Sequence, residues 1–412
     1  MRRLLKLGVA ALALSAGQAY GEELVIYHNW SSPSEVAALG VLRRALEAKG
    51  HVWTDIAIPH DTGSNVSLMS LVTGGTPPNV FLESSPGFYR DLVAQGLGRP
   101  LTQYMADNKI FEHYPDAVQK AITIDGEVMK VPTGIHIDGM IYYNLDVAAK
   151  SGVDPTTWTS FDDMFASFDK IKAAGFIPIA IGAQAWQVGY LAHALAAAKE
   201  GPEFFTKIYG EAPDVAALDS AEMRDLLALL RQFQQAADEG SVNRDWNVST
   251  NLVISGKALF QLHGDWMKGE WRAAGKVAGK DFGCITPPGF KALSVTVDSW
   301  GILGGQSAAK DAAELDFVGI VADPQVQADF AAQKGSTPTR LDAPQDGLDV
   351  CSKNVLTALE NPAIQVRNPN NTVDADWMSS LWDVYFAYWS DPAMTADDAI
   401  AKMKENYDTI LN

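Results

Sequence analysis

Three short strand patterns follow one another near the start of the chain and constrain its fold more than any other feature. Apolar runs of β type occupy residues 24–27, 52–58 and 80–82, and helical patterns separate them. Consecutive units of this kind build a parallel sheet with helices on its faces, so we predict an α/β fold. Ligands bind such sheets beyond the carboxyl ends of the strands. The polar loops 28–33 and 60–63 are therefore candidate site segments.

The balance of charge and apolar content restricts the class of protein. The chain has 412 residues, enough for two domains of ordinary size, and 47% of them are hydrophobic. Lys and Arg total 32 against 50 Asp and Glu, which gives a formal net charge of -18. A chain this acidic offers no basic stripe for phosphates, so we expect no nucleic acid partner. The same charge disfavours adhesion to anionic lipid.

The first 19 residues have the composition of a secretory signal. Three basic residues lie near its start, residues 7–16 form a short apolar run, and residues 17–19 supply the small side chains that signal peptidase requires. We expect residues 1–19 to be removed on export to the periplasm. No lipobox cysteine follows, so we expect no lipid anchor. No later stretch has 18 uninterrupted apolar residues, so we expect no membrane insertion.

The chain contains two cysteines, Cys284 and Cys351. In an exported protein an isolated pair of this kind favours one disulfide, because the compartment is oxidising. The alternative is two separate buried thiols. Neither cysteine has the neighbours that a zinc site requires.

The stretch 243–271 contains a sequence of turns and aromatic residues that suggests a rigid corner. A Ser-Gly-Lys turn at 255–257 precedes an apolar strand at 258–262, which ends at Gly264 and Asp265. We expect Asp265 to cap a helix that starts at Trp266, because its carboxylate can accept N–H groups of the first turn. Trp266 is then held beside a buried strand.

The remaining elements alternate between strands and helices, with no internal repeat. Strands are expected at 128–132, 140–143, 177–181 and 294–297, and helices at 145–151, 161–174, 188–199, 203–209, 220–239 and 377–389. Ser34 is expected to cap the first helix. Residues 133–139 lie between two of the expected strands, and residues 361–371 are expected to form a loop.

Several tryptophans and polar residues fall at the predicted ends of these elements. The tryptophans are Trp30, Trp186, Trp246, Trp266 and Trp300, and the polar residues are Glu35, Asp61, Thr62, Glu83, His136, Gln187, Asp298 and Lys334. A pyranose has a C–H-rich face that packs on indole and hydroxyls that need donors and acceptors, so the pattern indicates a sugar site. The alternative for each residue is an ordinary core tryptophan, surface carboxylate or helix cap.

The motifs RDWN, VISGKA, GDW, EW, AGKDFGC and PPG follow in this order between residues 244 and 289. This order resembles the extracellular solute-binding proteins, family 1, of sugar ABC transporters, most of all their glucose/mannose-binding branch. The resemblance implies a two-lobe periplasmic-binding-protein fold with a hinge and a ligand cleft between the lobes. It implies a monomer that needs no cofactor, binds a mono- or small oligosaccharide and delivers it to membrane permease subunits.

The same resemblance implies discontinuous lobes and a set of ligand-binding positions. The N-terminal lobe would contain residues 20–134 and about 285–345, and the C-terminal lobe about 135–284 and about 346–412. The implied site residues are Asn29, Trp30, Ser31, Glu35, Glu83, His136, Trp266, Asp298, Lys334 and Asn370; Thr62 and Gln187 join them by their place at element ends.

Three of these positions differ from what the branch has. Asn29 stands where the family commonly has the first of two adjacent tryptophans, Glu83 where it has a lysine, and Asn370 where it has a histidine. An ionised glutamate only accepts hydrogen bonds, whereas a lysine only donates them. We therefore expect a ligand other than free glucose, with a disaccharide or a glycosylated polyol as alternatives.

A secreted glycosidase is the alternative from a different class. Glu35, Glu83, Asp265 and Asp298 could supply the pair of carboxylates that sugar hydrolysis needs. No G-x-S-x-G elbow, Walker loop, H-E-x-x-H or EF-hand motif occurs, and the Ser-Gly-Lys turn lacks the Walker glycine spacing. We therefore expect a binding protein and not an enzyme.

Overall fold

The computed structural model describes residues 21–58, 64–83, 86–369 and 373–411. The predicted signal segment 1–19 lies outside the described residues. Within the described ranges, no helix combines the length and the apolar character that crossing a membrane requires.

The three strand patterns at the start of the chain form the parallel core of the first sheet, as predicted. β1 (Glu23–His28) pairs in parallel with β2 (Val52–Ala57) on one side and with β3 (Val80–Glu83) on the other. The sheet continues with β11 (Leu293–Ile302), which is antiparallel to β3 and carries β12 (Gln365–Arg367) and β6 (Lys130–Asp138).

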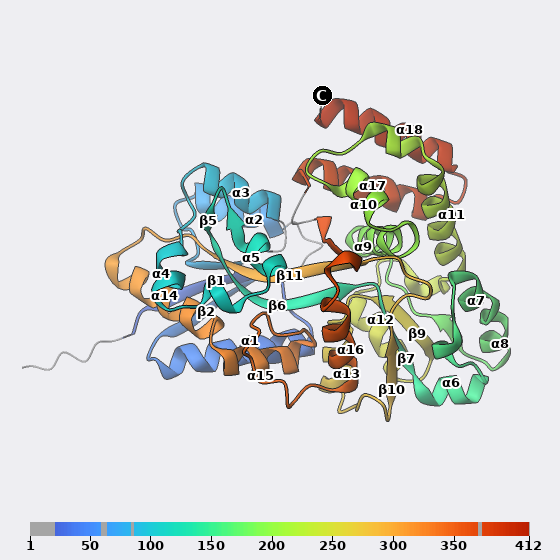
Figure 1. The fold of residues 1–412 in the computed structure, drawn as a ribbon, viewed down its shortest axis with the longest axis horizontal. Coiled ribbons are helices and arrows are strands. Elements are labelled where there is room, and N and C mark those ends of the chain that lie inside the picture. The colour runs from blue at the N-terminus through green and yellow to red at the C-terminus, as the bar shows by residue number, and fades with distance from the viewer. Residues whose placement is uncertain (1–20, 59–63, 84–85, 370–372, 412) are drawn as a thin grey trace, which may run out of the picture.

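A second sheet of four strands lies apart from the first (Figure 1). Its order is β10 (Phe282–Ile285), β7 (Met140–Asn144), β9 (Ala258–His263) and β8 (Ile177–Ile179). A small hairpin of β4 (Thr123–Ile124) and β5 (Glu127–Val128) stands beside the first sheet.

Two long strands connect the sheets. β6 leads into β7 through Gly139, whose φ of +83° favours glycine, and β10 leads back into β11. β6 and β11 pair along most of their length, with an irregularity between Asp298 and Ser299. Bulges of this kind bend a strand and change where its side chains point. Figure 1 shows this strand pair running through the middle of the molecule.

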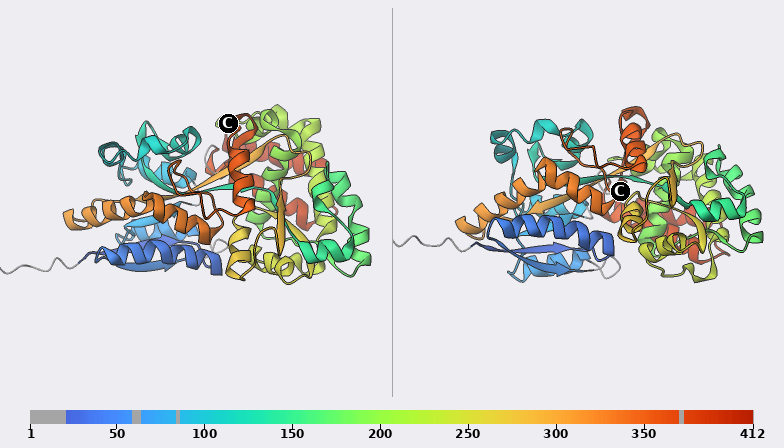
Figure 2. Two further views of the ribbon diagram at one scale, coloured as in Figure 1. Left: turned by 60° about the horizontal axis from the view of Figure 1, so that its bottom comes forward. Right: turned by 90° about the horizontal axis from the view of Figure 1, so that it is seen from below.

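Helices cover both sheets. Around the first sheet lie α1 (Pro33–Ala48), α2 (Ser64–Thr73), α3 (Pro86–Ala94), α4 (Thr102–Asp107), α5 (Asp116–Ile122), α14 (Ala308–Val321) and α15 (Pro324–Lys334). Around the second lie α6 (Leu145–Ser151), α7 (Phe161–Ala166), α8 (Phe168–Ala173), α9 (Ala185–Leu195), α10 (Pro202–Tyr209), α11 (Ala221–Ala236), α12 (Trp246–Ile254), α13 (Met267–Ala273), α16 (Val350–Leu359), α17 (Ala375–Ser390) and α18 (Ala396–Ile410). Both views in Figure 2 show the two groups as separate bodies joined at the middle.

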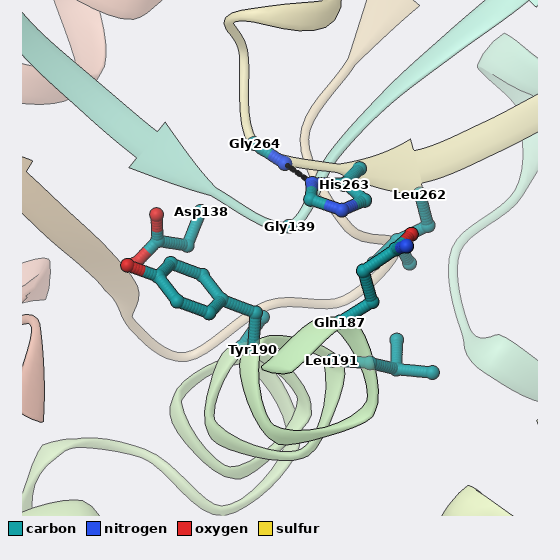
Figure 3. A pocket seen from close by; sticks show the side chains of 9 residues that line it. Asp138, Gly139, Gln187, Tyr190, Leu191, Leu262, His263 and Gly264 are labelled. Carbon is teal, nitrogen blue, oxygen red and sulfur yellow. Dashed lines mark hydrogen bonds between the residues drawn. The ribbon is translucent and has the colours of Figure 1, made fainter. Parts of the chain in front are cut away.

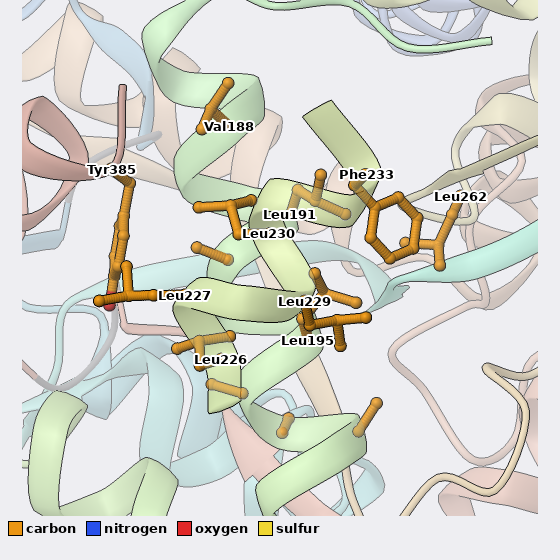
Figure 4. Close-up of a cluster of buried hydrophobic side chains, with 14 of the residues drawn as sticks. Val188, Leu191, Leu195, Leu226, Leu227, Leu229, Leu230, Phe233, Leu262 and Tyr385 are labelled. Atoms are coloured by element: carbon orange, nitrogen blue, oxygen red, sulfur yellow. The ribbon is translucent and has the colours of Figure 1, made fainter. Parts of the chain in front are cut away.

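Each group of helices buries its own apolar core. In the first, Leu39, Leu42 and Leu46 of α1 point inward, whereas Val36, which has the same predicted spacing, is exposed. In the second, α9 and α11 interdigitate around Leu195 and Leu230 (Figure 4). Separate cores of this kind let two bodies move relative to each other.

The predicted disulfide is present and ties the end of β10 to α16. The sulfur atoms of Cys284 and Cys351 are 2.02 Å apart, across 67 residues of sequence. Cys351 is fully buried in a cluster that includes Met267 and Trp271 of α13. The chain segment after residue 346 is thereby fixed to the second sheet.

Several predicted elements differ from the structure. Residues 365–367, within the predicted loop 361–371, form β12 because they pair with β11. Residues 133–138, expected to lie between two strands, continue β6, because β11 supplies a partner strand along this stretch. The helix predicted at 161–174 is two helices, since the hydroxyl of Ser167 donates to the Met164 carbonyl (2.6 Å). Ser32, not Ser34, caps α1.

Candidate functional site

Three turns from distant parts of the chain meet beside β6. They are residues 29–32 after β1, residues 264–266 between β9 and α13, and residues 334–337 after α15. Gly335 ends α15 in the left-handed region (φ +88°), and a Cβ there would lie 2.6 Å from the backbone nitrogen of Gly269. The last two turns can approach this closely only because glycine occupies the contact.

The ring of Trp266 is fixed by the turn that carries it. A Cβ on Gly264 would lie 2.1 Å from a carbon of the indole, so the ring packs directly on backbone. His136 and His263 meet the indole edge-on, with ring centroids 5.3 and 5.2 Å away. Trp266 is only 7% exposed. Its orientation is therefore set by backbone and aromatic contacts on several sides.

Lys334 contacts tryptophans of the other two turns, Trp30 after β1 and Trp266 before α13. Its Nζ lies 4.9 Å from the ring centroid of Trp30 and 5.8 Å from that of Trp266, at distances where an ammonium is attracted to an indole. The same nitrogen is 3.8 Å from Oε1 of Glu35. Lys334 is 3% exposed and belongs to the last turn of α15, where a positive charge is favoured by the helix dipole.

Glu35 is held by the N-terminus of its own helix. Its Oε2 accepts the N–H groups of Ser31 (2.9 Å) and Ser32 (3.0 Å), and the Ser32 hydroxyl accepts the N–H of Glu35. This reciprocal arrangement is a capping box. It stabilises α1 and leaves Oε1 directed at Lys334, so the predicted site residue also has a structural function.

His136 lies between two carboxylates. Its Nδ1 is 2.5 Å from Oδ1 of Asp265, and its Nε2 is 3.1 Å from Oδ2 of Asp298. Burial alone would lower the pKa of His136, but the charges and hydrogen bonds of the two aspartates outweigh burial and raise this pKa above its ordinary value. The side chain of Asp298 is 18% exposed, whereas His136 and Asp265 are fully buried.

We refer to the residues that meet at this point as the central cluster: Trp30, Glu35, His136, Asp265, Trp266, Asp298 and Lys334. Six of the twelve predicted ligand-binding residues belong to it. The cluster combines two indoles with cationic donors and carboxylate acceptors at the junction of the two sheets. Such a combination can hold a polar molecule that also has an apolar face.

The other predicted residues lie around the cluster or outside the described part of the chain. Asn29 is buried and Ser31 is exposed, on either side of Trp30. Glu83 ends β3 opposite Ser299, next to Asp298 in sequence, but its side chain is not described. Gln187 lines a separate cavity between α9 and the end of β9. Thr62 and Asn370 lie outside the described residues.

Two predictions about individual residues were wrong. Asp265 does not cap α13 with its side chain; its carboxylate instead bonds His136, and Trp266 occupies the cap position. Trp300 is fully buried within β11, two residues before its end, and packs against Trp30 and Phe317, so it is a core residue. In both cases a long-range partner replaced the local role that the sequence suggested.

Sequence reasoning missed His263, which ends β9. Its ring has Trp186, Trp246 and Trp266 around it at centroid distances of 5.6, 6.4 and 5.2 Å. The available signal was its position directly before the Gly-Asp-Trp turn. β9 is buried on both faces, so alternation along the strand does not distinguish His263 from its core neighbours.

The described residues contain no group of three or more His, Cys, Asp or Glu side chains placed to hold a metal ion. His136 and its two aspartates are engaged with one another as charged pairs.

Comparison with known proteins gives a consistent result. The family model described as bacterial extracellular solute-binding protein matches residues 59–357. A protein of Brucella suis biovar 1 named "Probable sugar-binding periplasmic protein" is 33% identical over 370 residues, covering 86% of each chain.

Solved structures share the fold. A chitin oligosaccharide binding protein has a TM-score of 0.80 at 17% identity, covering 94% of this chain and 98% of its own. The bacterial solute receptor AcbH, described as preferring β-D-galactopyranose, has a TM-score of 0.80 at 16% identity, covering 95% and 100%. The predicted fold class is thereby confirmed, while the glucose/mannose branch stays a prediction.

Proposed function

Because the chain belongs to the family of bacterial extracellular solute-binding proteins, we propose that it captures a sugar in the periplasm and delivers it to the permease of an ABC importer. The names of its relatives support a carbohydrate ligand and a periplasmic location. The observation that carries the proposal is the convergence of Trp30, Trp266 and Lys334 with buried carboxylates in the central cluster.

The chemistry of the cluster suits a sugar ring. Indole faces accept the C–H-rich side of a pyranose, and the ammonium of Lys334 donates to hydroxyl oxygens. Asp298 is the partly exposed member and accepts hydroxyl protons, while His136 and Asp265 behind it keep its position fixed. Groups held in this way need little reordering when a ligand binds.

We further propose that the two bodies are the lobes of a hinged binding protein. The N-terminal lobe contains residues 20–134 and about 285–345, and the C-terminal lobe about 135–284 and about 346–412. The connected pair β6 and β11 forms the hinge region, since both sheets are joined through it. Closure of the lobes would bury a ligand at the central cluster.

The ligand is a mono- or small oligosaccharide, or a glycosylated polyol. Glu83 and Asn370 differ from the residues of the glucose/mannose branch, so we do not expect free D-glucose to be the sugar that binds most tightly. We propose binding without catalysis: Glu35 and Asp265 already accept hydrogen bonds from N–H groups, so neither is placed as a proton donor toward a glycosidic bond.

A thermal-shift panel tests the proposal. The panel contains D-glucose, D-mannose, D-galactose, D-xylose, maltose and glucosylglycerol. A sugar present at 100 times its Kd stabilises the folded protein by about 2.7 kcal/mol, so at least one member should raise Tm measurably, and D-glucose should not give the largest rise. A panel without any shift would contradict the proposal.

Two tryptophan variants provide the matched control. Trp266→Ala should weaken binding of the best sugar about 10-fold or more, because an aromatic contact of this kind is worth over 1 kcal/mol. Trp271 lies in α13, which begins directly after Trp266, but packs on Phe282 in the core. Trp271→Phe should therefore lower Tm and leave the Kd for the sugar unchanged. An unchanged Kd in Trp266→Ala would show that Trp266 is a core residue and does not contact the sugar.

A further inference from the structure

A small cavity lies between α9 and the end of β9 (Figure 3). Its lining includes Asp138, Gln187, Tyr190, Leu191 and His263. Its free volume of about 10 Å³ is what a single water molecule needs. Figure 3 shows Gln187 reaching from α9 toward β9, and the ring of Tyr190 directing its hydroxyl toward Asp138.

His263 presents a hydrogen-bond donor to this cavity. The N–H of Gly264 donates to Nδ1 of His263 (2.8 Å), so Nδ1 is an acceptor and the proton of the neutral ring is on Nε2. Nε2 is shielded from solvent and has no hydrogen-bond partner among the described residues. Burial lowers the pKa of His263 to about 4, so the ring is neutral at physiological pH.

Gln187 also lines this cavity and has one unpaired acceptor. Its Nε2 donates to Oε1 of Gln184 (2.7 Å) and to the carbonyl of Arg244 (2.9 Å), and these two oxygens fix which end of the amide is nitrogen. Oε1 of Gln187 is then the free end: it is buried and has no partner within the described part of the chain. The residue is 3% exposed.

One fixed donor and one fixed acceptor in a space of this size match a hydroxyl group, which accepts one hydrogen bond and donates another. A charged group would leave one of the two without its complement. The cavity adjoins the central cluster through Trp266, whose ring contacts both His263 (5.2 Å) and Tyr190 (5.8 Å). The same indole contacts His136.

We propose that this cavity is a specificity subsite that receives one hydroxyl of the bound carbohydrate, with Nε2–H of His263 donating to it and Oε1 of Gln187 accepting from it. The inference rests on the proposed function. A water molecule has the same hydrogen-bonding chemistry, so the test must distinguish a sugar hydroxyl from water.

The test combines protein variants with deoxy sugars. The tightest-binding sugar of the panel above and each of its monodeoxy analogues are titrated into wild type, His263→Phe, Gln187→Met and Leu191→Met. One analogue should bind wild type 10- to 100-fold more weakly, because it leaves both protein groups without a partner. That penalty should fall to within about 2-fold in the first two variants and persist in Leu191→Met, which alters only an apolar wall.

A measurement on the wild-type protein covers the case in which a variant fails to fold. In protein labelled with ¹⁵N-histidine, the Nε2–H signal of His263 should shift when the parent sugar saturates the protein, and not with the discriminating analogue. Equal penalties for that analogue in wild type and both variants, or an unmoved signal, would assign the cavity to water and overturn the subsite while leaving sugar binding intact. If no panel sugar binds wild type, the proposed function fails and the subsite with it.

Discussion

Replacing His136 with leucine is expected to destabilise the ligand-free protein by about 3–5 kcal/mol at pH 7. Such a cost follows when one partner of a buried charge pair is removed and the other stays buried. Asp265 would lose its bond to Nδ1, and its Oδ2 already has no partner among the described residues. Urea-induced unfolding of wild type and His136→Leu measures the difference.

The pH dependence of the same unfolding experiment identifies the cause. The pKa of His136 is raised in the folded state, so its contribution is complete below about pH 6.5 and is lost as pH rises through the folded pKa. Wild-type stability should therefore decrease above pH 6.5 with a slope that His136→Leu lacks. The pKa of His263 is lowered to about 4, so its titration affects the free energy of unfolding in a separate range, between pH 4 and 6.5.

The double variant His136→Leu/Asp265→Asn is the matched control. Since neutralising the aspartate removes the stranded charge, the double variant should be less destabilised than the sum of the two single variants. Strict additivity, or a cost of His136→Leu below about 1 kcal/mol, would show that the charged pair does not stabilise the junction of the sheets.

Removing the disulfide by the substitutions Cys284→Ser and Cys351→Ser is expected to cost about 4 kcal/mol, from the entropy of closing a loop of 67 residues in the unfolded chain. The segment most affected should be α16, which the bond attaches to β10. Unfolding of wild type and the double variant in urea gives the difference.

A reducing agent distinguishes the effect of losing the disulfide from the effect of the serine side chains. Dithiothreitol should lower the stability of wild type toward that of the serine variant and leave the variant unaffected. Thiol titration of the denatured, unreduced wild type should find no free thiol. Two titratable thiols, or equal stability of wild type and variant, would contradict the role assigned to the bond.

Much of the fold could be predicted because its elements carry local signals. The strands of the first three units and the strand before Gly264 were placed within one or two residues. Residues 133–138 could not be, since they have the turn-like sequence TGIHID and become strand only by pairing with β11. The same long-range pairing lengthened the strand predicted at 294–297.

The structure brings together predicted site residues that lie in motifs, whereas the partners of other residues could not be predicted from the sequence. Trp266 and Lys334 lie in turns whose glycines permit close backbone contact, and turns of this kind are visible in a sequence. Asp265 bonds His136, 129 residues away, and His263 shares its cavity with Gln187, which is on another element. Neither pairing leaves a local pattern, so only the folded structure reveals it.

Calorimetric titration of the purified protein with the tightest sugar of the panel measures directly whether the central cluster binds a sugar. We expect saturable binding of one sugar per chain, weakened about 10-fold or more in Trp266→Ala, and chromatographic recovery of the sugar unchanged after prolonged incubation. Absence of heat with every sugar of the panel, or the appearance of a hydrolysis product, would contradict a sugar-binding protein built around the central cluster.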